Sequence, residues 1–254
     1  MKKLFLLSAF IILSINPLLL NAQINLKDSA AITTLITINY SFQFSGGDLK
    51  ERYGNNSTVG SSILFKTKKN WIIGADFNYI FGNEVKISDQ IMKNIATSDG
   101  YLITREGVYG DTKMFERGFF TSIKLGKVIP VFHSNPNSGL MIIGSVGLLQ
   151  HSIRIEVDNN AAPQLEGDYA RGYDRLSSGL AVSQFIGYLN LSDRKLTNFF
   201  AGFEFVQGWT KTLRDYNFDT MSIDKSQKFD TFWGFKIGWI FPIYKRAPEK
   251  FYYN

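Results

Sequence analysis

The segment from Trp71 to Gly82 alternates between two kinds of side chain. Odd positions carry Ala or large apolar and aromatic residues, whereas even positions carry Gly, Asp or Asn, apart from Ile72 and Ile80. A period of two is that of an extended strand, whose successive side chains point to opposite faces. Such a strand fits a soluble protein with its apolar face in the core. It fits equally a barrel with its apolar face against lipid and a narrow polar interior.

The same alternation recurs along the chain and predicts about eight strands. They are expected at residues 31–44, 58–67, 71–82, 118–131, 140–157, 180–189, 196–210 and 229–241. The segment 180–189 is the weakest of these, because both of its faces are mixed. In segment 140–157 the apolar positions change from even to odd numbers near His151, which predicts a β-bulge there.

The connections between the predicted strands alternate in length. Short turns are expected at 68–70, 133–137 and 190–195, and longer loops at 45–57, 83–117, 158–179 and 211–228. Short turns at one end and long loops at the other are typical of bacterial outer-membrane barrels, whose turns face the periplasm. The sequence therefore predicts an all-β protein, an eight-stranded antiparallel up-and-down transmembrane β-barrel.

A soluble lipocalin-like barrel or β-sandwich is the alternative fold. Its core would have to hold four tryptophans and many phenylalanines, and its surface would consist largely of Gly, Ser and Thr with few charges. We favour the membrane barrel, because soluble barrels normally have a more charged outer face. The tryptophans concerned are Trp71, Trp209, Trp233 and Trp239.

The first residues predict export from the cytoplasm. A basic start at Lys2 and Lys3 precedes an apolar stretch and a small residue, Ala22, which together form a secretory signal peptide. We expect residues 1–22 to be removed, 23–30 to be a periplasmic segment, 31–244 the outer-membrane barrel and 245–254 a periplasmic tail. The chain has no cysteine, so no disulfide is expected to brace the exported protein.

Composition narrows the function further. Aromatic residues make up 15% of the chain, which suits strands with aromatic girdles. The formal charge is +6, and removal of Lys2 and Lys3 leaves +4, too mild a basic balance to indicate nucleic acid. No metal-ligand cluster or phosphate-binding loop stands out, so we predict no cofactor, no metal and no small-molecule substrate.

Four charged residues fall on the predicted polar face near the middle of their strands: Asp76, Lys124, Glu204 and Lys236. Their charges sum to zero. Because buried charges are tolerated only when they are paired, we predict a central ion-pair cluster inside the barrel. Its role is either a polar plug that locks the barrel or a proton or ion relay, and the plug is the favoured interpretation.

With these features, the chain resembles the small eight-stranded outer-membrane barrels of the OmpA transmembrane domain and OmpX type. The signal peptide resembles those of Bacteroidota, and the PorT family of type IX secretion is a further resemblance in that phylum. The likeness covers residues 31–244 and rests on architecture, not on a diagnostic motif. It implies an outer-membrane location and a filled interior, and no peptidoglycan-binding domain is expected after residue 244.

Some barrels of this size modify lipid A and need a His and a Ser at the outer rim. His151 beside Ser152 is the candidate here, although neighbours on a strand point to opposite faces. We therefore predict a non-enzymatic protein that serves as a structural or interaction platform. The alternative is an accessory subunit of a Bacteroidota envelope machine, in type IX secretion or outer-membrane protein assembly, and a lipid A-modifying enzyme is third.

The predicted partners are outer-membrane lipid and other envelope proteins, which would bind through loops or tail. Ser88 is expected to cap a helix over 89–96, whose apolar side would either cap the barrel mouth or dock a partner. That side consists of Ile91, Met92 and Ile95. The third long loop is a recognition surface or stacks on itself, and its residues of interest are Asp168, Tyr169, Arg171, Tyr173, Asp174 and Arg175. The aromatic residues of the tail are Phe251, Tyr252 and Tyr253.

Overall fold

The computed structural model describes residues 30–131, 135–157, 162–192 and 197–244. The predicted signal peptide and most of the predicted N-terminal segment lie outside these residues. So do the predicted tail, with Phe251, Tyr252 and Tyr253, and the turn residue His133.

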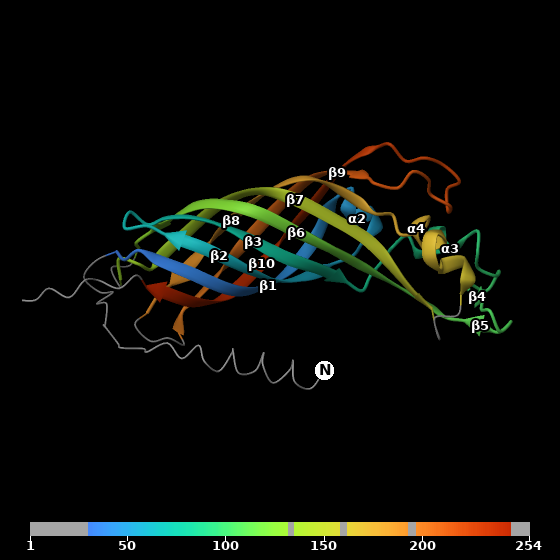
Figure 1. Ribbon diagram of the computed structural model, residues 1–254, viewed down its shortest axis with the longest axis horizontal. Helices are drawn as coiled ribbons and strands as arrows, with labels where there is room; N and C mark the ends of the chain where they lie inside the picture. The colour runs from blue at the N-terminus through green and yellow to red at the C-terminus, as the bar shows by residue number, and fades with distance from the viewer. Residues whose placement is uncertain (1–29, 132–134, 158–161, 193–196, 245–254) are drawn as a thin grey trace, which may run out of the picture.

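Eight strands close into one antiparallel barrel (Figure 1). They are β1 (Thr33–Gly47), β2 (Asn56–Lys66), β3 (Trp71–Gly82), β6 (Thr112–Ile129), β7 (Gly139–Val157), β8 (Ser177–Asn190), β9 (Phe199–Thr212) and β10 (Gln227–Tyr244). Each strand pairs with the next of the eight along the chain, and β1 pairs with β10 to close the ring. The prediction of an eight-stranded up-and-down barrel is confirmed.

The register shows how strongly the strands are inclined. A circuit that follows paired residues from Phe44 of β1 through each strand in turn returns to β1 at Thr34, ten residues earlier. An offset of this size in an eight-stranded barrel corresponds to strands tilted by about 40° from the barrel axis. Such a barrel is narrow enough for side chains to fill its interior.

The two alternating sets of residues in each strand lie on opposite faces of the barrel wall, one facing the interior and the other facing outward. On β10 the residues Trp233, Phe235, Ile237 and Trp239 point outward and are about half exposed, whereas Lys236 between them is buried. Because every strand obeys the same period of two, the outer wall is a band of exposed apolar and aromatic side chains. The interior holds polar residues together with buried apolar ones, among them Phe120, Phe200 and Phe232.

The predicted β-bulge near His151 is wrong. Pairing of β7 with β6 continues without interruption through this residue to Val157, and its pairing with β8 is uninterrupted up to His151, where it ends. Ile153 points inward like His151 and is buried, while Arg154 points outward and is exposed. The apolar side changes because the outer part of β7 rises beyond the apolar band, where loops cover its inner face and its outer face carries charges.

The longer connections lie together at one end of the barrel, and the short turns lie at the other (Figure 1). The long connections contain α2 (Leu49–Arg52), α3 (Ser88–Met92), β4 (Leu102–Ile103), β5 (Tyr109–Gly110), η2 (Pro163–Leu165) and α4 (Gly167–Arg171). Strand β6 begins at Thr112, six residues before the predicted Gly118, because it continues beside the extended β7 into the loop region. Among the described residues, none of the helices is both long and apolar enough to cross a membrane.

The predicted helix over 89–96 is shorter than expected, and Ser88 does not cap it. The helix begins at Ser88 itself, with Ile87 at the cap position and no side-chain cap hydrogen bond, and it ends at Met92. Ile91 and Met92 are buried. Packing of these two residues on neighbouring loops holds this short helix in place, because one turn and a half is too short to be stable alone.

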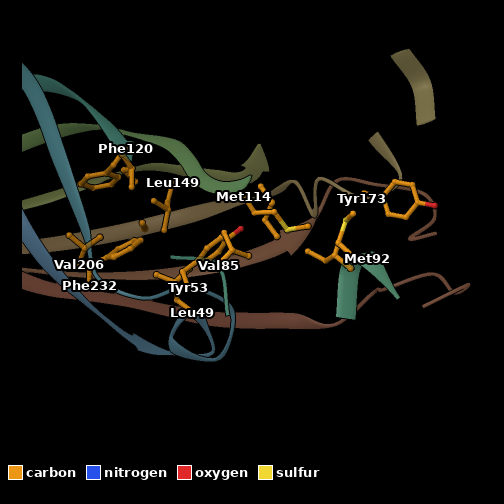
Figure 2. Packing of buried hydrophobic residues seen from close by; sticks show 14 of the residues in the cluster. Leu49, Tyr53, Val85, Met92, Met114, Phe120, Leu149, Tyr173, Val206 and Phe232 are labelled. Atoms are coloured by element: carbon orange, nitrogen blue, oxygen red, sulfur yellow. The ribbon is translucent and has the colours of Figure 1, made fainter. Parts of the chain in front are cut away.

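Two buried apolar clusters fill the described part of the barrel. The larger begins inside the outer half with Phe120, Leu149 and Phe232 and continues into the loops through Tyr53 and Met92 (Figure 2). The smaller occupies the other half. Between them lie the four mid-barrel charged residues Asp76, Lys124, Glu204 and Lys236, so that apolar layers separate these four from both ends of the barrel.

Candidate functional site

The structure brings the four predicted interior charges together. Lys124 Nζ lies 2.8 Å from Asp76 Oδ2, and Lys236 Nζ lies 2.9 and 3.0 Å from the two carboxylate oxygens of Glu204. Two longer contacts join the pairs, at 3.8 Å between Lys124 and Glu204 and 3.9 Å between Lys236 and Asp76. All four residues are at most 5% exposed.

The cluster has the composition of a neutral plug. Asp76 also accepts hydrogen bonds from Ser122 Oγ, at 2.5 Å, and Asn78 Nδ2, at 2.7 Å. Two cavities adjoin the cluster, of about 10 and about 20 Å³, and each has room for one water molecule. Neither is large enough for a hydrated ion, so the interior charges are suited to locking the strands together.

A second buried polar cluster, at the outer mouth of the barrel, was missed by the sequence analysis. Asp230 of β10 accepts hydrogen bonds from His151 Nε2 at 2.9 Å and Thr210 Oγ1 at 2.5 Å, and it forms a salt bridge with Arg52 of α2. Asp48, at the start of α2, accepts a 2.6 Å hydrogen bond from the backbone N–H of Phe229. Together these contacts hold α2 in the mouth of the barrel.

The signal that could have found this cluster is the parity of Asp230 and His151. Each has the same parity as the inward residues of its strand, and each is an ionisable residue. Because a bulge was expected near His151, the face of β7 to which His151 points could not be assigned from parity alone. Arg52 lies in a loop, and no periodicity in the sequence specifies where a loop residue is placed. Only the closed register brings three residues from distant parts of the chain to one point.

His151 and Ser152 do not form a catalytic pair. His151 is completely buried and faces the interior, with Asp230 on Nε2 and the ring of Tyr53 at 5.6 Å between centroids. Ser152 is on the opposite face of β7. The neighbour pair that suggested a lipid A-modifying enzyme therefore gives no support to that function.

The remaining long connections interlock above the mouth, and we call this assembly the loop crown (residues 83–111, 162–176 and 213–226). Arg105 contacts both carboxylate oxygens of Glu166, at 3.0 and 3.2 Å, and Gln164 Nε2 donates to the Ile103 carbonyl at 3.0 Å. Asn94 Nδ2 donates to the carbonyls of Phe218 and Asp219. The crown is thus a connected surface and not a set of independent loops.

The six candidate residues of the third loop divide into two groups. Asp174 forms a salt bridge with Arg214, and its hydrogen bond raises the pKa of the Arg214 guanidinium, while Arg175 forms a salt bridge with Asp219. Tyr173 is buried; its ring packs on Phe218, and burial raises the pKa of its phenol. These three residues join the third loop to the fourth.

The second group faces solvent. Asp168 and Arg171 pair with each other at 2.9 Å and are largely exposed, and the Tyr169 side chain is 64% exposed. At the hairpin β4–β5 next to them, the rings of Tyr101 and Tyr109 lie 5.7 Å apart between centroids and tilted by 36°, and both remain exposed. The part of the third loop available to a partner is therefore its helix α4, beside this hairpin.

The apolar side of α3 packs inside the protein. Ile91 and Met92 belong to the larger buried cluster, and Ile95 packs against it half-buried. In Figure 2, Met92 points toward Tyr173 of the third loop. The helix thus packs within the loops above the barrel, and the side chains of Ile91 and Met92 are not free to dock a partner.

Within the described residues, no group of three or more His, Cys, Asp or Glu side chains is placed to hold a metal ion. No protein-family model matches the chain. No curated protein sequence matches it either.

Solved structures give only loose similarities. The attachment invasion locus protein Ail of Yersinia pestis shares 11% identity over 83% of this chain and 99% of its own, with a TM-score of 0.45. Neisserial surface protein A (NspA) shares 9% over 81% and 94%, with a TM-score of 0.38. The N-terminal β-barrel domain of OprF of Pseudomonas aeruginosa shares 10% over 82% and 99%, with a TM-score of 0.36. These similarities are too weak to carry a conclusion about function.

Proposed function

We propose that this protein is a non-enzymatic outer-membrane β-barrel whose loop crown is a preformed platform for a protein partner outside the cell. The observation that carries the proposal is the contrast between wall and crown. The wall exposes a band of aromatic and aliphatic side chains on every strand, which in water would be a very large apolar patch and in a bilayer is the expected surface.

The crown has the properties of a binding surface. Its loops are joined by salt bridges and hydrogen bonds, so little conformational entropy would be lost when a partner binds. It also exposes tyrosines together with charged residues, a mixture common at the energetic centres of interfaces: Tyr101, Tyr109, Asp168, Tyr169 and Arg171. A filled interior leaves this surface as the part best suited to recognition.

The location can be tested with single-cysteine variants, because the natural chain has no cysteine. A maleimide reagent that cannot cross membranes should label Tyr109→Cys, in the crown, on intact cells. Lys69→Cys, in the short turn between β2 and β3, should be labelled only after the envelope is permeabilised. Equal labelling of both variants on intact cells would contradict the proposed orientation.

The platform role requires a partner that contacts the crown. Crosslinking from Tyr109→Cys and Tyr169→Cys on cells, followed by mass spectrometry, should give the same partner from both positions. Lys69→Cys is the matched control at the opposite end and should not give it. Crosslinks that are the same for all three variants, or absent from both crown variants, would count against a platform.

The more specific roles predicted from the sequence share this location. An accessory subunit of a Bacteroidota secretion or assembly machine would remain bound to other envelope proteins in mild detergent, and mass spectrometry of the purified complex would identify them. A lipid A-modifying activity would change lipid A in a deletion strain. A preparation without other envelope proteins, together with unchanged lipid A in the deletion strain, would leave the crown platform as the remaining function.

A further inference from the structure

Two glutamines interrupt the apolar band on the outer wall. Gln184 is exposed on the outward face of β8, with Val182 and Ile186 on either side of it along the strand. Across the sheet it pairs with Phe205 of β9 and with Gly144 of β7. An amide therefore lies in the middle of the band that, under the proposed function, meets lipid.

An amide in this position is strongly unfavourable in hydrocarbon. A glutamine side chain has two N–H donors and a carbonyl oxygen with two lone pairs, and none of them can be hydrated by lipid. Among the described residues, neither Gln184 nor the half-exposed Gln207 of β9 has a side-chain hydrogen bond. Ser61 and Thr121 are also outward, but a hydroxyl can bond to a nearby backbone carbonyl, and Thr121 Oγ1 donates to the Asp76 carbonyl of the adjacent strand at 3.0 Å.

The two glutamines are aligned along the barrel axis. Gln207 pairs with Val182, whereas Gln184 pairs with Phe205, so the two amides are diagonal neighbours on one face of the β8–β9 ladder. Because the strands are tilted, a residue of β8 lies closer to the short-turn end of the barrel than its paired residue on β9. Gln207 lies two residues nearer the crown than Phe205, the partner of Gln184. With strands tilted by about 40°, this diagonal runs almost parallel to the axis, with about 8 Å between the two Cα atoms.

The wall beside the glutamines also differs from the rest of the band. The outward residues in the lower and middle part of β7 are Ile142, Gly144, Val146 and Leu148, without an aromatic ring, whereas β3, β9 and β10 carry several each. A Cβ built on Gly144 would meet nothing nearer than the Leu125 carbonyl at 4.0 Å. On its β7 side, the surface next to Gln184 is therefore without aromatic rings and open to close approach.

We propose that the outward face of β7, β8 and β9 around Gln184 and Gln207 is a dimer interface within the membrane, occupied by a second copy of this chain. This inference rests on the proposed membrane location. Two copies inserted in the same direction are related by a twofold axis parallel to the membrane normal, and the two glutamines lie along a line with that direction. Because an amide is both donor and acceptor, each glutamine can pair with its own counterpart across the axis.

The interface can be tested by crosslinking the full chain in phosphatidylcholine vesicles. Under mild oxidation, Gln184→Cys should form a disulfide-linked dimer. Ser61→Cys is the matched control, because Ser61 is exposed at the middle of β2, on the opposite side of the ring from β8. Equal crosslinking at the two positions, or none at Gln184→Cys, would overturn the proposal.

A second measurement tests the role of the amides. In wild-type protein, energy transfer between labelled copies should decrease as the lipid-to-protein ratio rises, and the Gln184→Leu/Gln207→Leu variant should need roughly a tenfold higher protein density to associate. The same association in wild type and variant would overturn the role of the glutamines. Crosslinking of Gln184→Cys in cells only to a different protein would overturn the second copy as occupant.

Failure of the membrane proposal gives a different result. Insertion is measured separately, by quenching of the outward tryptophans with brominated lipid and by the shift in gel mobility on boiling. If neither Gln184→Cys nor Ser61→Cys inserts, the membrane location is wrong. If both insert and Gln184→Cys does not crosslink, only the dimer interface is wrong.

Discussion

Neutralising Glu204 is the sharpest test of the interior charge cluster. In Glu204→Gln the remaining carboxylate nearest to Lys236 is Asp76, at 3.9 Å, and Asp76 already bonds Lys124 at 2.8 Å. The cluster would carry an uncompensated positive charge in a site that is at most 5% exposed. Breaking a buried pair by removing one partner typically costs about 3–5 kcal/mol. Since the glutamine carbonyl can still accept a hydrogen bond from Lys236, we expect the lower end, about 3 kcal/mol.

The assay is reversible urea unfolding of the protein in vesicles, followed by tryptophan fluorescence. A loss of about 3 kcal/mol at a slope of about 1–3 kcal/mol/M lowers the midpoint by about 1–3 M urea. The matched control is Glu166→Gln, which breaks the exposed pair with Arg105 and should change stability by less than about 1 kcal/mol. The double variant Glu204→Gln/Lys236→Met restores neutrality and leaves Asp76 paired with Lys124, so it should recover most of the loss.

Two results would refute this reasoning. One is a Glu204→Gln midpoint equal to that of Glu166→Gln, which would mean that the charge is not effectively buried. The other is a double variant less stable than the single one, which would mean that Lys236 stabilises the barrel by packing and not by its pairing with Glu204.

Three further expectations follow from the structure. Arg52→Met removes the salt bridge with Asp230 that ties α2 to the barrel wall, so trypsin should cleave the first loop at least several-fold faster while the barrel still resists. An unchanged cleavage rate would mean that this salt bridge does not hold α2 in place. Gly202→Val should prevent barrel formation, because a Cβ there would lie 2.4 Å from the Cα of Gly187, and a heat-modifiable band on gels would show this expectation to be wrong. Burial raises the pKa of Asp224, but the hydrogen bond from Lys228 and those of its other neighbours outweigh burial and lower it to about 2. A lowered pKa stabilises the fourth loop above the ordinary value near 4, and this contribution is lost as pH falls toward 2. Pepsin should therefore cleave this loop in the wild type only as pH approaches 2, and already near pH 4 in Asp224→Asn. The same dependence of cleavage on pH in both proteins would mean that the Asp224–Lys228 interaction does not stabilise the loop.

The sequence predicted strand bounds and side-chain directions correctly wherever a single period of two ran through the whole strand. Trp71 to Gly82 is a strand with the predicted bounds, and Asp76 and Glu204 point inward as their parity required. The helix around Ile91 was placed correctly but made too long, because its end depends on packing against other loops. At His151 the sequence misled, because an apolar inner face beyond the exposed apolar band has the same pattern as a change of phase.

The sequence by itself determined the class of fold, because a wall between two environments imposes its period on every strand that forms it. The tertiary structure alone decided which inward residues meet. The offset of ten residues around the ring brings Lys236 within 3.9 Å of Asp76, His151 to Asp230 and Gln207 into line with Gln184. No local pattern encodes that offset, because it belongs to the closed ring as a whole. The crown is likewise held by contacts between loops far apart in the chain, for which a single sequence carries no periodic signal.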